Sequence, residues 1–432
     1  MRKEADKAEA VLEIFKAYGI NSVVDFGLSV NSEFDVGLKL GQKLGLDDLD
    51  RLIQSAVSGR LATEFLAFVL TGYISANSAE AVFDTELSEC PADFISELLS
   101  KTRLTGANLP IVGKLLNASE FMYWTKVSEN SLVLFDGENA MYAIDHLRNA
   151  RRSSTALSVC EPCIYRKESI SSDLLLSLLE ETLEQTDIND INEHLVRPVI
   201  KELESRRNED IGDRLAAIEF SLLPLLEVYS DSRPDALYAA IGCNAELFCE
   251  FIEHGYKKRH QSESDNVELP QGIRQRLGIL SVNFRSVPGT DWSGNFNADV
   301  FNEWLSKVKA WAKENDRYEV AMQFVGQGLS YAPKKDRVLI YEPMIAALND
   351  ADAEEMRKGY ILGVMNQRGA HFVDPTGNEE RAIADKYQKA SDEALAMGYL
   401  RYSHALRRIA EYYLREAQQT VKEEAERKQE EE

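Results

Sequence analysis

The sequence predicts an all-α protein built as an α-solenoid, in which degenerate helical hairpins stack on one another and end in a C-terminal helical module. Short amphipathic segments with apolar residues at i, i+3, i+4 and i+7 follow one another along almost all 432 residues, and strand-like alternation is nearly absent. Two helices joined by a short connection within about 30–45 residues are typical of helical-repeat proteins. No residue pattern recurs at a fixed period, so the sequence assigns neither a tetratricopeptide (TPR) nor a HEAT class to the stacking.

Helix signals are regular in the first part of the chain. Gly19 and Gly59 follow two apolar stripes and are expected at C′ positions, where glycine adopts positive φ at little cost. Pro198 and Pro224 fall inside expected helices, so each helix should kink or break there. The expected helices are Val11 to Tyr18, Leu49 to Val57, Phe94 to Leu99, Ala140 to Leu147, Thr155 to Cys163, Leu174 to Leu183, Ile191 to Leu203, Leu215 to Tyr229, Ala236 to Ile241 and Ala245 to Tyr256.

The remaining helices follow after a polar stretch. Asn297 is a candidate N-cap for a strongly amphipathic helix, and residues 288–294 (PGTDWSG) read as a turn. The helices expected here are Pro270 to Phe284, Val300 to Trp311, Tyr318 to Leu329, Pro343 to Leu348, Ala353 to Met365, and a long terminal pair that starts near Asn378 and Leu400.

Changes in composition predict the domain organisation. Residues 257–268 are polar and charged and lack helical apolar spacing, which favours a flexible joint at 257–270. The joint separates an α-helical repeat array at 1–256 from a C-terminal helical module at 271–420. Residues 421–432 are almost wholly charged and form a tail that extends the last helix.

The charge of the chain restricts its partners. A formal net charge of −23, from 72 acidic and 49 basic residues, repels phosphate backbones, so we expect no nucleic-acid partner. Apolar stretches are too short for a membrane span of about 20 residues, and the N-terminus lacks the apolar core of a secretory signal. We therefore expect a cytoplasmic protein without a membrane partner, and the sequence does not predict its oligomeric state.

The five cysteines do not predict a disulfide framework. Their odd number, in a chain without a secretory signal, favours free thiols in a reducing compartment. Cys160 and Cys163 form a lone CxxC that has no second pair of ligands at zinc-binding spacing and follows a helix rather than a strand. We expect these to be buried thiols, and we expect Cys243 and Cys249 to be small core residues.

Sequence motifs for catalysis and cofactor binding are not found. The chain contains no P-loop, GxGxxG, HExxH, GxSxG or EF-hand pattern. Gly326 and Gly328 fall inside a helical pattern rather than after a strand, so they do not indicate a nucleotide site. The sequence therefore predicts no catalytic residue, no metal site and no cofactor.

Several passages resemble the C-terminal helical-repeat regions of large, uncharacterised bacterial multidomain proteins. They are Leu215 to Glu227 (LAAIEFSLLPLLE), Asn244 to Glu253 (NAELFCEFIE), the run from Pro288 to His371, and Arg407 to Ala410 (RRIA), with a weaker similarity in layout back to Tyr123 and Trp124. The similarity covers most of the chain and is sharpest over residues 215–413. It implies helical-repeat architecture, a bacterial origin and descent from a longer protein, and it carries over no functional residue.

One loop is a candidate binding site. Residues 366–371 (NQRGAH) and 374–381 (DPTGNEER) bring Arg368 and His371 close in sequence to Glu380 and Arg381. Such a loop can bind an anion, with Arg368 as a surface-exposed fork donor. Alternatively, Arg368 and Gly369 complete one helix and Asn378 caps the next.

The last helix carries a second candidate surface. Arg401, His404, Arg408, Glu411 and Arg415 recur three or four residues apart and therefore share one polar face. Arginines near tyrosines can form a partner interface, for which Arg401 and Arg408 are the candidates. The alternative is a solvated face.

These observations lead to two functional hypotheses. The first is a non-enzymatic helical scaffold or adaptor that binds another protein or domain, as the extended surface of helical repeats favours. The second is a ligand or anion sensor, or a hydrolase without a recognisable motif, that uses the loop between Arg368 and Arg381. Similarity to bacterial multidomain proteins would place either function in a bacterial stress or defence system.

Overall fold

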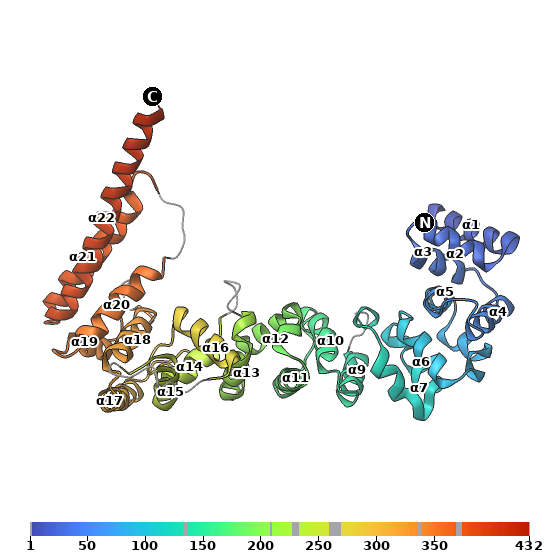
Figure 1. The fold of residues 1–432 in the computed structure, drawn as a ribbon, viewed down its shortest axis with the longest axis horizontal. Helices are drawn as coiled ribbons and strands as arrows, with labels where there is room; N and C mark the ends of the chain where they lie inside the picture. The colour runs from blue at the N-terminus through green and yellow to red at the C-terminus, as the bar shows by residue number, and fades with distance from the viewer. Residues whose placement is uncertain are drawn as a thin grey trace. The chain divides into compact units, whose positions relative to one another are not determined.

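In the computed structural model the described part of the chain is all-α, as the sequence predicts (Figure 1). The structure describes residues 2–132, 137–207, 210–226, 233–258, 269–334, 339–368 and 374–431. These residues contain helices and short 3₁₀ turns but no strand ladder; the turn at 288–296 closes on an isolated antiparallel bridge between Thr290 and Phe296. No helix among them is long and apolar enough to cross a bilayer.

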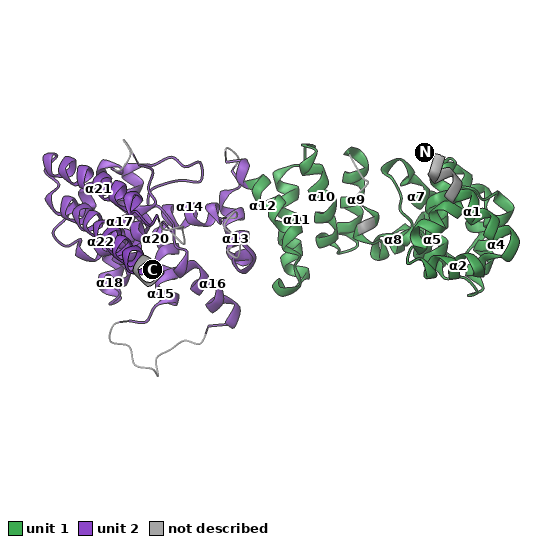
Figure 2. Cartoon of the chain, turned by 90° about the horizontal axis from the view of Figure 1, so that it is seen from above, with its two compact units in different colours: residues 1–203 green, residues 204–432 purple. Residues whose placement is uncertain are grey.

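Two compact units make up the chain, residues 1–203 and residues 204–432 (Figure 2). The division falls within α12 (Glu193–Ser205), and the predicted joint at 257–270 lies inside the second unit. Residues 259–268 of that joint lie outside the described residues, so its flexibility stays a prediction. The helices before and after it, α15 (Ala245–Gly255) and α16 (Gln271–Val282), pack against each other.

The first unit consists of short helices that pack on their neighbours in the chain. α9 packs on α10, for example, and α10 packs on α11. The helices are α1 (Arg2–Tyr18), α2 (Ile20–Ser29), α3 (Glu33–Gly41), α4 (Leu46–Val57), α5 (Thr63–Ala76), α6 (Ala92–Lys101), α7 (Pro110–Leu116), α8 (Glu120–Lys126), α9 (Gly137–Asn149), α10 (Ser153–Tyr165), α11 (Ser172–Gln185) and α12; 3₁₀ turns span Ala79–Asp84, Glu86–Glu89, Gly106–Asn108, Asn117–Ser119, Glu129–Ser131 and Ile188–Asp190.

Helices α3 and α5 approach unusually closely because glycine replaces a side chain at their crossing. A Cβ on Gly41 would overlap the Val69 carbonyl oxygen, and one on Gly72 would overlap the Leu38 carbonyl oxygen. Small residues allow such backbone contact.

A partly buried polar network joins successive helices in the same unit. Arg148 on α9 donates to both carboxylate oxygens of Glu181 on α11, with Nε distances of 3.1 and 3.2 Å. Ser153 Oγ on α10 donates to Glu181 at 2.7 Å. One carboxylate therefore fixes the spacing of three consecutive helices.

Neither internal proline breaks its helix, which leaves a kink as the remaining expectation from the sequence. α12 continues through Pro198, and α13 (Gly212–Leu226) continues through Pro224, so neither helix ends there. Buried leucines on both sides of Pro224, and buried leucines and valines on both sides of Pro198, hold each helix together, because tertiary packing outweighs the loss of one backbone hydrogen bond. Gly19 and Gly59 have positive φ angles of 82° and 73° and end α1 and α4 as predicted.

The second unit contains α13, α14 (Asp235–Cys243), α15, α16, α17 (Ala298–Glu314), α18 (Tyr318–Ser330), α19 (Glu342–Asn349), α20 (Glu354–Asn366), α21 (Asn378–Ala396) and α22 (Leu400–Glu431). Asn297 caps α17 as predicted, since its side chain accepts hydrogen bonds from the amides of Asp299 and Val300. α21 and α22 start at the two predicted residues, and the charged tail is an extension of α22.

An aromatic core lies beneath α15 and α18. Phe251 stacks on Phe284 with centroids 5.3 Å apart, and Phe324 meets each ring edge-on at 5.2 Å. Beside this core, the largely buried Arg317 donates to the backbone carbonyls of Glu253 and Tyr256 at 3.2 and 3.1 Å. Arg317 thereby satisfies carbonyl groups that the end of α15 would otherwise leave unpaired.

Two further contacts shape the end of the chain. At the α18–α20 crossing, a Cβ on Gly326 would overlap the Met356 carbonyl oxygen, and one on Gly359 would overlap the Gln323 carbonyl oxygen. α21 and α22 lie side by side as a hairpin, with the buried Ser391 and Ser403 hydroxyls 2.9 Å apart (Figure 1). Small residues along both helices permit this close pairing.

Candidate functional site

The second unit contains an apolar groove between α13, α14, α15 and α16, with a volume of about 710 Å³. Cavities of 300–1,000 Å³ with mostly apolar linings are typical binding sites. α14 contributes one part of the lining, whereas α13 and α15 each present a stripe of residues at i, i+3, i+4 and i+7. The lining residues are Asp213, Ala216, Ala217, Phe220, Leu237, Ala240, Ile241, Cys243, Asn244, Leu247, Glu250, Phe251, His254, Ile273, Leu277 and Leu280.

Negative charge prevails among the polar residues of this groove. Asp213 and Glu250 are exposed, and neither has a cationic partner among the described residues. Cys243 lines the groove near Asp213, and burial, followed by the nearby Asp291 and Asp213 carboxylates, raises the pKa of its thiol. The groove therefore combines an apolar lining with an acidic rim.

Cys243 corrects one prediction from the sequence. It is exposed in the groove, whereas Cys249 is buried as predicted. Cys160 and Cys163 are also buried, on α10, and burial raises the pKa of these thiols to about 12 and about 11. Both thiols of the CxxC pair therefore lie in the packed interior of the first unit.

The structure brings together only part of the predicted loop site. Arg368 Nη1 lies 2.6 Å from Glu380 Oε1, and Arg368 Nη2 lies 3.0 Å from Glu379 Oε2. The Arg368 side chain is 18% exposed and that of Glu380 is 3% exposed, which corrects the expectation of a surface arginine. The guanidinium joins the end of α20 to the start of α21, and an incoming anion would have to displace two carboxylates to reach it.

The other loop residues have separate positions. Arg381 donates to the Thr376 carbonyl at 2.9 Å and to Asn378 Oδ1 at 3.2 Å, on the exposed start of α21. Asp374, rather than the predicted Asn378, accepts the backbone hydrogen bond that begins this helix, from Asn378 N at 3.2 Å. His371 and Gly369 lie outside the described residues.

A buried tyrosine cluster adjoins the Arg368–Glu380 ion pair. The Tyr360 and Tyr402 hydroxyls are 3.1 Å apart, and Tyr387 stacks on Tyr413 with centroids 6.4 Å apart. Burial raises the pKa of the Tyr413 hydroxyl, and the nearby Arg368 partly offsets that rise. The ion pair thus belongs to the packed junction of α20, α21 and α22.

Arg401 and Arg408 are both exposed on α22, on the polar face that the spacing predicts. Arg401 lies at the start of the helix, where its amide donates to Asn349 Oδ1 at 2.8 Å. Asn349 also accepts from the Tyr402 amide at 3.3 Å and so caps α22 from a neighbouring helix. Neither arginine converges with Arg368 on one site.

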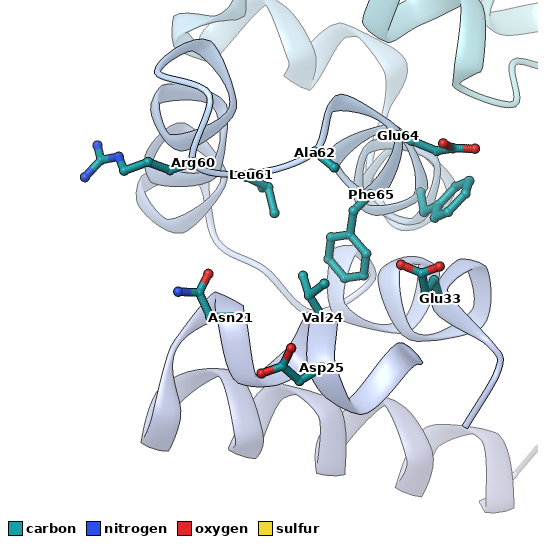
Figure 3. A pocket seen from close by; sticks show the side chains of 10 residues that line it. Asn21, Val24, Asp25, Glu33, Arg60, Leu61, Ala62, Glu64 and Phe65 are labelled. Carbon is teal, nitrogen blue, oxygen red and sulfur yellow. The ribbon is translucent and has the colours of Figure 1, made fainter. Parts of the chain in front are cut away.

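A smaller pocket of about 320 Å³ lies in the first unit between α2, α3 and α5 (Figure 3). Val24, Leu61 and Phe65 give it an apolar interior, and the Arg60 side chain points away from it. Asp25, Glu33 and Glu64 contribute carboxylates to its lining. The pocket is smaller and less apolar than the groove of the second unit.

In comparisons with known proteins, no family model, curated protein or solved structure matches the chain. The similarity to bacterial multidomain proteins accordingly stays a prediction. Across the part of the chain that the structure describes, no group of three histidine, cysteine or acidic side chains could hold a metal ion.

The sequence interpretation missed the groove, although a signal for it was present. α13 buries Leu215, Ile218 and Leu222, yet it also carries Ala216, Ala217 and Phe220 on another side. A helix that is apolar on more than one face has more than one surface to cover.

Proposed function

We propose that this protein is a non-enzymatic helical-repeat scaffold, located in the cytoplasm, that binds another protein. The observation that carries the proposal is the groove of α13–α16, whose apolar lining is open at the surface and has an acidic rim. Contiguous apolar surface of this kind, rimmed by polar residues, is typical of a protein-binding site.

Two further features support a scaffold over a sensor at the loop between Arg368 and Arg381. The Arg368 guanidinium is held by Glu379 and Glu380, and these contacts join two helices. Arg381 and Arg401 likewise make contacts that complete helix ends. In this proposal each unit is a stack of helical hairpins, and the second unit presents the groove to the partner.

Affinity purification of the tagged full-length chain from its native host, followed by mass spectrometry, tests this function. We expect a protein that co-purifies in near-stoichiometric amount and is absent from a tag-only control. Recovery of the chain alone, at salt concentrations low enough to preserve weak complexes, would reject the scaffold function.

A further inference from the structure

We infer that the groove of α13–α16 binds an amphipathic helix of a partner protein, and that this helix carries basic residues beside its apolar stripe. The inference rests on the proposed scaffold function and specifies the class of partner. Helix-in-groove recognition uses apolar anchors at i, i+3, i+4 and i+7 on the bound helix.

The shape of the groove fits such a helix. Ala216, Ala217 and Phe220 on α13 face the same hollow as Leu247 and Phe251 on α15. The side-chain ridges of one helix fit into the grooves between the ridges of another. The stripes on α13 and α15 can therefore pack against a bound helix of the partner. Leu247 is 38% exposed, which leaves apolar surface available for burial.

The charges around the groove indicate which sign of charge the partner helix carries. Asp213 and Glu250 lie on the rim, and Asp291 is near Cys243 at the same end as Asp213. His254 lines the groove farther along α15, and the Arg276 guanidinium lies 5.8 Å above the Phe220 ring. The carboxylates repel fatty acids and other anionic amphiphiles, whereas lysine or arginine beside an apolar stripe complements the Asp213 end.

The probe for this inference is a fluorescent leucine–lysine peptide of about 18 residues, roughly five helical turns, with leucines at i, i+3, i+4 and i+7. Two control peptides accompany it: one has the same composition with the leucines shuffled off the stripe, and one has glutamate in place of lysine. We expect the full-length protein to bind the first peptide at least about tenfold more tightly than either control.

Substitutions locate the binding surface. Leu247→Glu and Ala217→Glu introduce a charge at two exposed positions of the groove, and each should weaken peptide binding about tenfold or more, because the carboxylate would face the leucine stripe of the bound peptide and lose its hydration. Val282→Glu is the matched control, since Val282 is 80% exposed on α16 and does not line the groove. Asp213→Asn with Glu250→Gln should weaken binding of the lysine peptide by roughly three- to tenfold at low salt.

Cys243 offers an independent readout of where the peptide lies. It is the exposed member of the five cysteines, and we expect bound peptide to protect it from alkylation by iodoacetamide. Equal binding of the shuffled peptide, unchanged binding by Leu247→Glu, or an unprotected Cys243 in the complex would each overturn the inference.

The same variants separate this inference from the proposed function. Affinity purification with Leu247→Glu should lose the partner that the wild-type chain and Val282→Glu retain. If all three recover the partner equally, the scaffold function stands and the groove is not its binding site. If none recovers a protein, the scaffold function itself fails.

Discussion

The Arg368 side chain joins the end of α20 to the start of α21 through Glu379 and Glu380. Arg368→Ala leaves the buried Glu380 carboxylate without its arginine, and we expect it to lower the free energy of unfolding by about 2–3 kcal/mol. Arg408→Ala, on the exposed face of α22, is the control and should cost less than about 0.5 kcal/mol. Urea unfolding of both variants measures the difference in the free energy of unfolding. Equal midpoints would show that the ion pair does not stabilise the fold.

Glu219 is a second residue whose surroundings determine its behaviour. Its side chain is fully buried on α13, and one oxygen accepts a hydrogen bond from the Leu237 amide at 2.8 Å. Burial raises the pKa of this carboxyl well above its ordinary value of 4.5, and the nearby Glu204 and Asp235 add to the rise. The native state therefore keeps a proton that the unfolded chain has already released.

The sign of the pH effect follows from this difference in bound protons. As pH rises from 4.5 toward the pKa of the folded state, the Glu219 proton costs the native state progressively more, so stability falls. Glu219→Gln keeps a neutral side chain with an oxygen that can accept from Leu237. We expect this variant to raise the melting temperature most at alkaline pH and little near pH 4.5, whereas Glu411→Gln on the α22 surface should change neither. A uniform shift at every pH would contradict the assignment.

Residue-level prediction from the sequence succeeds where a contact is local. Gly19 and Asn297 act within one turn of their own helices, and both have the predicted roles. Arg368 and Cys243 differ from prediction because their environments depend on residues outside their own helices: Glu380 on the next helix pairs with Arg368, and the turn at Asp291, far along the chain, lies near Cys243. Local spacing carries no information about which distant helix covers a side chain.

At the scale of elements, the closest helix pairs depend on glycine. Gly326→Ala would place a Cβ against the Met356 carbonyl and 2.7 Å from the Tyr360 nitrogen, both backbone atoms of α20. Backbone cannot rotate away as a side chain can, so we expect a loss of about 3 kcal/mol, at the upper end for overpacking. Thermal unfolding should show the loss.

Gly278 supplies the matched control for that substitution. It is also a helix-interior glycine, but a Cβ there would meet nothing within 4 Å. Gly278→Ala should stabilise the protein by roughly 0.5–1 kcal/mol because alanine restricts the unfolded chain and favours the helix. If both variants shifted stability in the same direction, the close contact between α18 and α20 would not be what distinguishes them.

The helices themselves were largely predictable, and their pairing was not. The apolar stripes and caps gave the starts of α17, α21 and α22, because each signal lies within a few residues. Gly359 and Gly363 show a small-residue spacing in the sequence, but its meaning appears only with Gly326 on the facing helix. For the same reason the groove of α13–α16 follows from four helices together and from none of them alone.

At the scale of the whole molecule, composition and packing mark different positions along the chain. Residues 257–268 are the most polar stretch between apolar segments, yet the two compact units meet at residues 203 and 204. The aromatic contacts of Phe251 with Phe284 and Phe324 keep the helices on both sides of that stretch in one core. Which helices share a core is a property of packing, and polarity along the chain reports only which segments lie at the surface.

Separate cores imply separate local stabilities, which hydrogen exchange can measure. Gly41→Ala strains the α3–α5 crossing of the first unit, and Gly326→Ala strains the α18–α20 crossing of the second. Since about 1.4 kcal/mol changes an opening equilibrium tenfold, each variant should accelerate amide exchange about tenfold or more near its own crossing. Mass spectrometry of peptides from the full-length chain should show the change within residues 1–203 for Gly41→Ala and within residues 204–432 for Gly326→Ala. Loss of protection across both units from either substitution would show instead that the two cores unfold as one cooperative body.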